Sequence, residues 1–215
     1  MNNWIDGVMA FVVLTNLFLM GSSRLAACIR IVAAQGIALG FFSLLIHEGE
    51  VTTRLALLAL WSAGLKGIVF PWLLRRAIRE TDARREVEPI VGYTASLLIG
   101  TAALAISLWI SSRLPLPIAD ATLSLSVSVA FFTIMTGFFI IVSRNKAVTQ
   151  VLGYLTLENG IYIIGVALVQ KAPLLVEFAI LLDVFVAVFV MGITIFHINR
   201  EFDHIDTDRL SSLKE

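Results

Sequence analysis

Three ionisable residues stand inside long apolar stretches of the sequence, where water is scarce: Lys66, Glu158 and Asp183. A charge at the centre of a bilayer costs about 2.5–3.5 kcal/mol on insertion scales, so it must be neutralised, paired or hydrated. Removal from water disfavours the charged form of each group, which would allow these side chains to exchange protons near neutral pH. Lys66, Glu158 and Asp183 are therefore predicted to form a proton path. The alternative is structural, with Lys66 pairing with a carboxylate here or on a neighbouring subunit to fix helix packing.

Further polar residues could support these charges. Gln35 and Asn159 also lie within apolar stretches, where they could bond between helices or hold water. His197 lies near the end of residues 174–198, where a helix dipole favours a cation. It would act as a proton entrance or as an interfacial cap. Gln35, Asn159 and His197 are thus predicted to be the polar support of the path.

The elements that position these residues follow from composition and length. Hydrophobic residues make up 58% of the 215 positions, charged residues 15%, and the mean hydropathy is +0.90. A water-soluble domain carries about 25% charged residues, and a helix needs roughly 20 apolar residues to cross a membrane. Seven stretches qualify: 4–20, 25–46, 53–74, 89–111, 121–142, 147–169 and 174–198. The fold class is predicted to be all-α, a polytopic membrane protein with about seven transmembrane helices.

The basic residues predict an orientation. With the N-terminus outside, twelve of the sixteen Lys and Arg residues fall in inner segments. Because inner loops are enriched in Lys and Arg, the chain is predicted to be N-out and C-in. Residues 75–86, which hold five of these arginines, are predicted to be an inner loop that enforces topology or docks a peripheral partner.

Two similar segments predict an internal repeat. Gln35-Gly36-Ile37 resembles Asn159-Gly160-Ile161, and the two copies lie on the second and the sixth predicted helices, four positions apart, so both would face the same way. The organisation is a possible 3+1+3 parallel repeat. It comprises an N-terminal three-helix unit at 1–80, a connector helix at 81–115 and a C-terminal three-helix unit at 116–215. Gly36 and Gly40 form a G-x-x-x-G pair that permits close helix contact.

Several functions are disfavoured by what the sequence contains. Formal net charge is zero, which gives no reason to expect a nucleic-acid partner. The sequence has no phosphate-binding loop, no dinucleotide fingerprint and no cluster of cysteine and histidine with metal-site spacing. The chain is therefore predicted to bind no metal or cofactor and to have no catalytic site of its own.

Two segments resemble a known family. Residues 145–165, with Leu157-Glu158-Asn159-Gly160 at their centre, resemble the second helix of the K-type subunit of respiratory complex I. They are also similar to the C-type subunit of multisubunit cation/proton antiporters. Over the whole chain, ending in the acidic tail that includes Asp203 and Asp206, the sequence resembles hydrogenase-4 component E, a membrane subunit of group 4 [NiFe]-hydrogenase and formate hydrogenlyase complexes.

This resemblance implies a role as a non-catalytic subunit of a membrane-bound hydrogenase in a bacterial or archaeal plasma membrane. Its partners would be antiporter-like membrane subunits and a peripheral hydrogenase arm that carries a nickel–iron centre and iron–sulfur clusters. Glu158 carries over as a proton-path carboxylate, whereas Asp183 stands where the K-type family usually has Glu. Three alternatives remain: a subunit of a cation/proton antiporter complex, a purely structural membrane module and a stand-alone transporter.

Overall fold

The computed structural model describes residues 2–45, 53–81, 90–114 and 121–168, and within these ranges the chain is helical with no β-strand. The elements are α1 (Asn2–Gly21), α2 (Leu25–Leu45), α3 (Thr53–Gly64), η1 (Leu65–Val69), α4 (Phe70–Thr81), α5 (Tyr93–Arg113), α6 (Ala121–Ser143) and α7 (Ala147–Leu168). The all-α prediction is confirmed for this part of the chain. The predicted span at 174–198 lies outside the described residues.

Four of the described helices are long and apolar enough to cross a membrane: α1, α2, α5 and α6. The predicted span at 53–74 is helical as well, and the one at 147–169 is helical through Leu168, but neither is among these four. The first is divided by the π-helical turn η1, and the second, α7, carries Glu158 and Asn159. The structure therefore supports a membrane protein, while the number of seven spans stays a prediction.

The stretch from Thr53 to Thr81 is one continuous helical run with a wider turn in its middle. At η1 the backbone N–H of Phe70 donates to the Leu65 carbonyl, five residues back. Pro71 follows directly and has no amide hydrogen to donate, so the regular α-helical ladder cannot run through this point. A π-helical turn next to the proline lets the helix continue with one extra residue in the turn.

Two sequence predictions about boundaries are wrong. Residues 75–86 were predicted to be a loop, but α4 continues to Thr81 because its sequence after Pro71 consists largely of good helix formers. The predicted helix at 89–111 instead begins at Tyr93. Gly92 is extended (ψ 153°) and precedes the first helical residue, and the Ile90 N–H donates to the Ser143 carbonyl at 3.0 Å rather than joining the helix.

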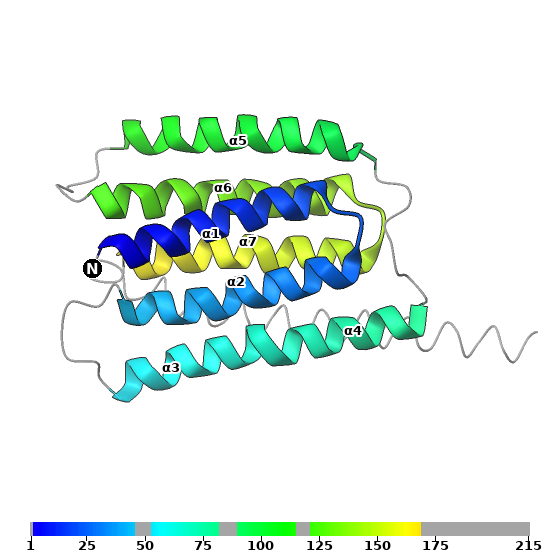
Figure 1. Cartoon of the computed structure of the whole chain (residues 1–215), viewed down its shortest axis with the longest axis horizontal. Coiled ribbons are helices and arrows are strands. Elements are labelled where there is room, and N and C mark those ends of the chain that lie inside the picture. Colours follow the sequence, from blue (N-terminus) through cyan, green and yellow to red (C-terminus); the bar gives the residue numbers. More distant parts are fainter. Residues whose placement is uncertain (1, 46–52, 82–89, 115–120, 169–215) are drawn as a thin grey trace, which may run out of the picture.

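The helices form an antiparallel bundle: when α3, η1 and α4 are taken as one helical run, each helix runs opposite to the one before it (Figure 1). At the centre α1 and α2 pack against α6 and α7. The run from α3 to α4 packs on α2, and α5 covers α1 and α6. Basic residues gather at the end of the bundle where α1 and α4 end and α7 begins: Arg24, Arg75, Arg76, Arg144 and Lys146. The N-out, C-in orientation itself stays a prediction, as do the three domain boundaries.

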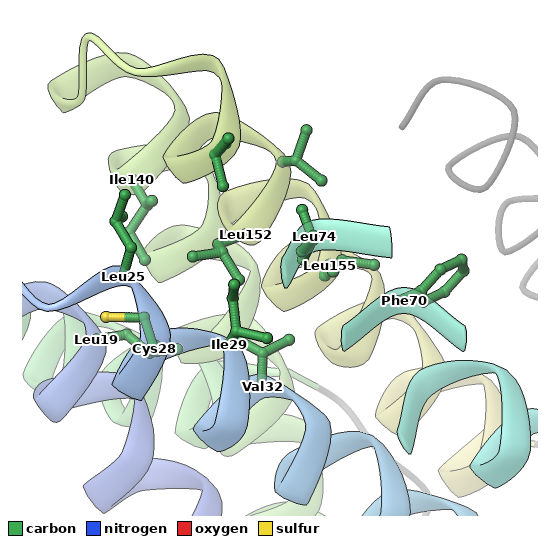
Figure 2. Packing of buried hydrophobic residues seen from close by; sticks show 12 residues of the cluster. Leu19, Leu25, Cys28, Ile29, Val32, Phe70, Leu74, Ile140, Leu152 and Leu155 are labelled. Carbon is green, nitrogen blue, oxygen red and sulfur yellow. The ribbon is translucent and has the colours of Figure 1, made fainter. Parts of the chain in front are cut away.

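Buried apolar side chains form two separate clusters in the bundle. One is near the basic end and includes Ile29 of α2, Phe70 of α4 and Leu152 of α7 (Figure 2). The other is near the N-terminus and includes Met9 of α1 and Ile163 of α7. Each of α1, α2, α6 and α7 supplies residues to both clusters, so the middle of these helices lies between two apolar layers.

Small residues set the closest helix contacts. A side chain on Gly36 would collide with Lys66, and a Cβ on Gly40 would come within 2.9 Å of the Ala63 Cβ. The predicted role of the Gly36 and Gly40 pair in close packing is therefore confirmed, and its partner is the helical run of α3 and η1. Close approach at Gly36 is what brings Lys66 into the centre of the bundle.

Candidate functional site: a buried ion pair and polar layer

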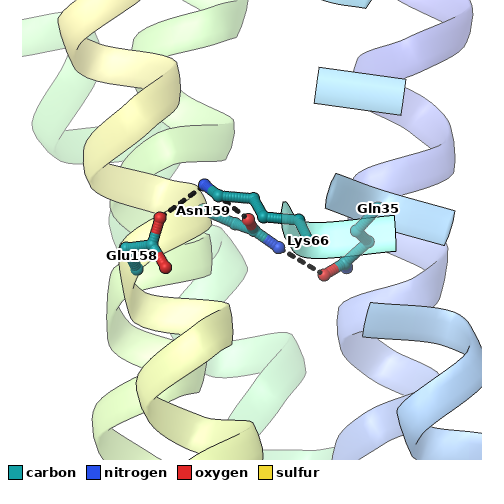
Figure 3. A network of polar contacts seen from close by, with 4 residues as sticks. All are labelled: Gln35, Lys66, Glu158 and Asn159. Atoms are coloured by element: carbon teal, nitrogen blue, oxygen red, sulfur yellow. Dashed lines mark hydrogen bonds and ion pairs between the residues drawn. The ribbon is translucent and has the colours of Figure 1, made fainter. Parts of the chain in front are cut away.

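Lys66 and Glu158 form an ion pair in the interior of the bundle. The Lys66 Nζ lies 2.5 Å from Glu158 Oε1, and the side chains are only 4% and 1% exposed (Figure 3). Lys66 Nζ also lies 4.7 Å from the centre of the Tyr162 ring, within the range of a cation–π contact. Two of the three predicted path residues are thus brought together, at positions 92 residues apart in the sequence.

The π-helical turn gives Lys66 its position. Lys66 is the second residue of η1, where the backbone turn is wider than in α3 and α4. Single π-helical turns occur often at functional sites because the extra residue re-aims a side chain. Here Lys66 is buried, whereas Ile68 and Val69 of the same turn are exposed.

Two amides connect the ion pair to α2. Lys66 Nζ donates to Asn159 Oδ1 at 3.3 Å, and Asn159 Nδ2 donates to Gln35 Oε1 at 3.4 Å (Figure 3). Both amide side chains are at most 1% exposed. Gln35 and Asn159, predicted as polar support, therefore lie in direct contact with each other, and Asn159 also contacts the lysine. They also occupy matching positions of the predicted repeat, which itself stays a prediction.

The hydrogen-bond chain continues through α1 to α6. Gln35 Nε2 donates to Asn16 Oδ1 at 2.9 Å and to Thr15 Oγ1 at 2.6 Å. Asn16 Nδ2 donates to Thr133 Oγ1 at 2.9 Å, and that hydroxyl donates to the Val129 carbonyl at 2.7 Å. The chain therefore runs from η1 through α7, α2 and α1 to α6, and it ends on a backbone acceptor.

These residues form a polar layer, by which we mean Lys66, Glu158, Asn159, Gln35, Asn16 and Thr133 together. On α1, α2, α6 and α7 the layer lies between the two apolar clusters. On α7, for example, Leu155 belongs to one cluster, Glu158 to the layer and Tyr162 to the other cluster. Buried polar groups are stable only when they are hydrogen-bonded or paired: the chain of bonds satisfies the amides and Thr133, and the ion pair with Lys66 holds the Glu158 carboxylate.

Two predicted site residues cannot be placed. Asp183 and His197 lie outside the described residues, so their roles stay predictions. Asn16 and Thr15 were not predicted, although both are polar residues inside the predicted span at 4–20, which was the available signal. Within the described ranges no three His, Cys, Asp or Glu side chains gather as metal ligands.

Arg144 is a second buried cation whose burial the sequence did not predict. It was counted among the inner-loop charges, yet its side chain is 2% exposed. Its Nη2 donates to the Met20 carbonyl at 2.7 Å, and its guanidinium carbon lies 4.7 Å from the centre of the Tyr93 ring. Arg144 therefore ties the connection between α6 and α7 to the end of α1 and the start of α5. A cation at the C-terminus of α1 is favoured by the helix dipole.

Comparison with known proteins gives two kinds of relative. The Uncharacterized protein Rv0085 of Mycobacterium tuberculosis is 32% identical over 212 residues, covering 98% of this chain and 96% of that protein. The chain belongs to the Rv0085 family. Hydrogenase-4 component E of Escherichia coli strain K12 is 28% identical over 160 residues, covering 73% of this chain and 74% of that protein. The protein of the same name in Shigella flexneri matches equally well.

The similarity of the Rv0085-family chain to hydrogenase-4 component E supports a family of membrane subunits of this kind. This agrees with the apolar helices of the structure. No protein-family model matches the chain, and no solved structure is significantly similar to it. The resemblance of the C-terminal region to complex I and antiporter subunits stays a prediction.

Proposed function

We propose that the chain is a non-catalytic membrane subunit of a hydrogenase-4-like complex and that its polar layer contributes to a proton or sodium path. Redox chemistry would take place in a peripheral arm on other chains, which would hold the nickel–iron centre and the iron–sulfur clusters. The neighbours in the membrane would be antiporter-like subunits. The similarity to hydrogenase-4 component E supports the kind of complex. The buried pair of Lys66 and Glu158 supports the role in ion movement.

The ion pair has the chemistry that a proton path requires. Transfer of a proton from Lys66 Nζ to Glu158 would convert the charged pair into a neutral amine and a neutral acid. In water the charged pair is strongly favoured, but burial disfavours both charges and brings the two states closer in energy. A change of charge or hydration nearby could then move the proton from one group to the other. Coupled groups of this kind share their titration, so the pair would act as one unit.

The amides give the path a boundary. Asn and Gln side chains donate and accept hydrogen bonds but do not ionise in the physiological range, so they transmit protons poorly. The chain from Asn159 through Gln35 to Asn16 therefore holds Lys66 in place and does not extend the path toward α1. Protons would reach the pair from the side of Glu158, and Asp183, predicted near the middle of the membrane, would be a further residue of the path.

The proposal is tested in the intact complex. Affinity purification of the tagged chain from its native membrane, with mass spectrometry and a hydrogen-evolution assay, should recover a nickel–iron large subunit and antiporter-like proteins. Recovery alone, or with antiporter subunits only, would refute the hydrogenase complex. Glu158→Gln should abolish hydrogen-linked ion pumping in membrane vesicles while the complex still assembles.

A matched control lies on the same helix. Thr156 is buried and its hydroxyl donates only within α7, to the Leu152 carbonyl at 2.8 Å. Thr156→Val should therefore leave pumping unchanged. Normal pumping by an assembled Glu158→Gln complex would remove Glu158 from the path.

A purely structural module is the second candidate, and the hydrogen-bonded amides favour it. In the described part of the chain, Asn159 and Gln35 bond to other buried side chains and to one backbone carbonyl, as expected of interhelical bonds that fix packing. This candidate predicts that Glu158→Gln lowers the yield of the complex, while each assembled complex pumps normally. The ratio of pumping to assembled complex thus separates the two functions.

A further inference from the structure

A pocket opens at the basic end of the bundle, away from the polar layer. It lies between α1 and α5, has a volume of about 540 Å³, and is lined by seven residues: Leu17, Phe18, Gly21, Ser22, Ser23, Arg24 and Leu97. The lining changes in character along the helix axis. Toward the middle of the bundle it is apolar, and toward the end it is polar and carries one cation.

The apolar part of the pocket faces the surroundings of the bundle. Phe18 and Leu97 are 46% and 40% exposed, although both belong to helices long and apolar enough to cross a membrane. Leu17 lies four residues before the end of α1, about 6 Å deeper than Gly21 at 1.5 Å per residue.

Gly21 keeps the pocket open at its middle. A Cβ at this position would lie 3.2 Å from the nearest atom of the Leu97 side chain, so a larger residue would press against Leu97 and narrow the space between α1 and α5. Gly21 therefore connects the apolar part of the pocket to the polar residues beyond it.

The polar part of the pocket presents a cation without an acidic partner. Arg24 is exposed, and within the part of the chain that the structure describes its side chain has neither an ion pair nor a hydrogen bond. Ser22 and Ser23 line the same space, and the Ser22 hydroxyl oxygen accepts the backbone N–H of Arg24 at 3.3 Å. A phosphate is the group that this combination favours, because a guanidinium binds phosphate oxygens with two parallel bonds and serine hydroxyls can donate to them.

We propose that this pocket binds one anionic phospholipid, with the phosphate on Arg24 and the two serines and an acyl chain along Leu17, Phe18 and Leu97. The proposal follows from the pairing of an apolar floor with a cation at the level where a helical hairpin leaves the membrane. Basic pockets between transmembrane helices are known to take anionic headgroups. The gathering of Arg75, Arg76, Arg144 and Lys146 at the same end of the bundle adds to the positive potential there.

Native mass spectrometry of the full-length chain in detergent tests this site. The probes are phosphatidylglycerol and phosphatidylcholine with identical acyl chains, each titrated onto delipidated protein. We expect one phosphatidylglycerol to bind in preference to phosphatidylcholine. Arg24→Gln should weaken phosphatidylglycerol binding about fivefold, the effect of one basic residue near a charged headgroup. Equal binding of the two lipids by the unaltered chain would refute the proposal.

Two further variants distinguish binding in this pocket from general electrostatic attraction of anionic lipids to the basic end of the bundle. Arg30 is exposed on α2 and does not line the pocket, so Arg30→Gln should leave the affinity unchanged. Leu97→Trp fills the apolar part while Arg24 remains, and it should also weaken phosphatidylglycerol binding. An equal loss with Arg30→Gln, or displacement of the lipid by inorganic phosphate alone, would overturn the assignment of a lipid site.

Discussion

Two cations are buried in the described part of the bundle, and each lies 4.7 Å from the centre of a tyrosine ring, but their partners differ. Lys66 pairs with the Glu158 carboxylate in the middle of the bundle. Arg144 donates to the Met20 carbonyl at the end of α1. A lysine and a carboxylate can exchange a proton, whereas an arginine keeps its charge at all physiological pH values. The same cation–π distance is thus found for Lys66, a side chain that can lose its proton, and for Arg144, a side chain that keeps its charge.

Substitution of Lys66 should give the largest effect and tests whether this cation depends on its carboxylate partner. Lys66→Met leaves the Glu158 charge buried without its lysine, which should lower the free energy of unfolding by about 3–5 kcal/mol. Unfolding of the purified chain in mild detergent by added denaturing detergent, followed by circular dichroism, measures the loss. The double variant Lys66→Met with Glu158→Gln should recover most of it, because no unpaired charge remains. A double variant as unstable as the single one would show that the two residues are not energetically coupled.

Substitution of Arg144 should lower the free energy of unfolding by less than substitution of Lys66 and should leave ion pumping intact. Arg144→Met removes a charge-assisted hydrogen bond and a cation–π contact, so we expect a loss of about 2–3 kcal/mol in the same unfolding assay. Arg144→Lys keeps the charge and should recover part of it. Ion pumping for each assembled complex should stay unchanged in both variants. Abolished pumping in a fully assembled Arg144→Lys complex would contradict the structural role.

A methyl group at Gly36 tests the packing that positions Lys66. Gly36→Ala places a Cβ where Lys66 lies, so it should push η1 away from α2 at a cost of about 1–3 kcal/mol. Gly64 is a matched control, since nothing lies within 4 Å of a Cβ at that helical position. Gly64→Ala should leave stability unchanged or raise it by up to about 1 kcal/mol. Equal effects of the two substitutions would argue against close contact at Gly36.

The smallest effect is expected far along the hydrogen-bond chain, at Asn16. Asn16→Ala removes the bonds to Gln35 and Thr133, and the unfolding assay should show a loss of about 1 kcal/mol. Thr101→Ala is the control, because that hydroxyl is exposed and donates only to the Leu98 carbonyl. Equal stability of Asn16→Ala and Thr101→Ala would show that the hydrogen bonds beyond Gln35 do not contribute to the free energy of unfolding.

The helices were the most predictable part of the fold. Long apolar runs must be helical in a membrane because every backbone group needs an internal partner, so the predicted stretches match the described helices closely. The start of α5 and the continuation of α4 to Thr81 were missed, because hydropathy locates the apolar part of a helix and not the residues at which the helix begins and ends. A helix that continues into the interface has no hydropathy signal at its end.

The site was predicted as a set of residues but not as a contact. Depth along each helix follows from residue counts, which placed Lys66 and Glu158 at comparable levels. Rotation about each axis does not follow from counts, and here it depends on the π-helical turn beside Pro71. The burial of Arg144 was missed for a different reason: a positive charge between two apolar runs has the same sequence pattern whether it faces water or a helix end.

The extra residue in η1 also constrains how the gene can change. A regular α-helix turns about 100° per residue, so deleting one residue between Leu65 and Val69 would restore the regular ladder and rotate one half of the helix by that angle. Either Lys66 would leave Glu158, or Phe70 and Leu74 would leave the apolar cluster that they share with α2 and α7. Insertions and deletions that a surface helix tolerates would therefore be selected against in this five-residue segment.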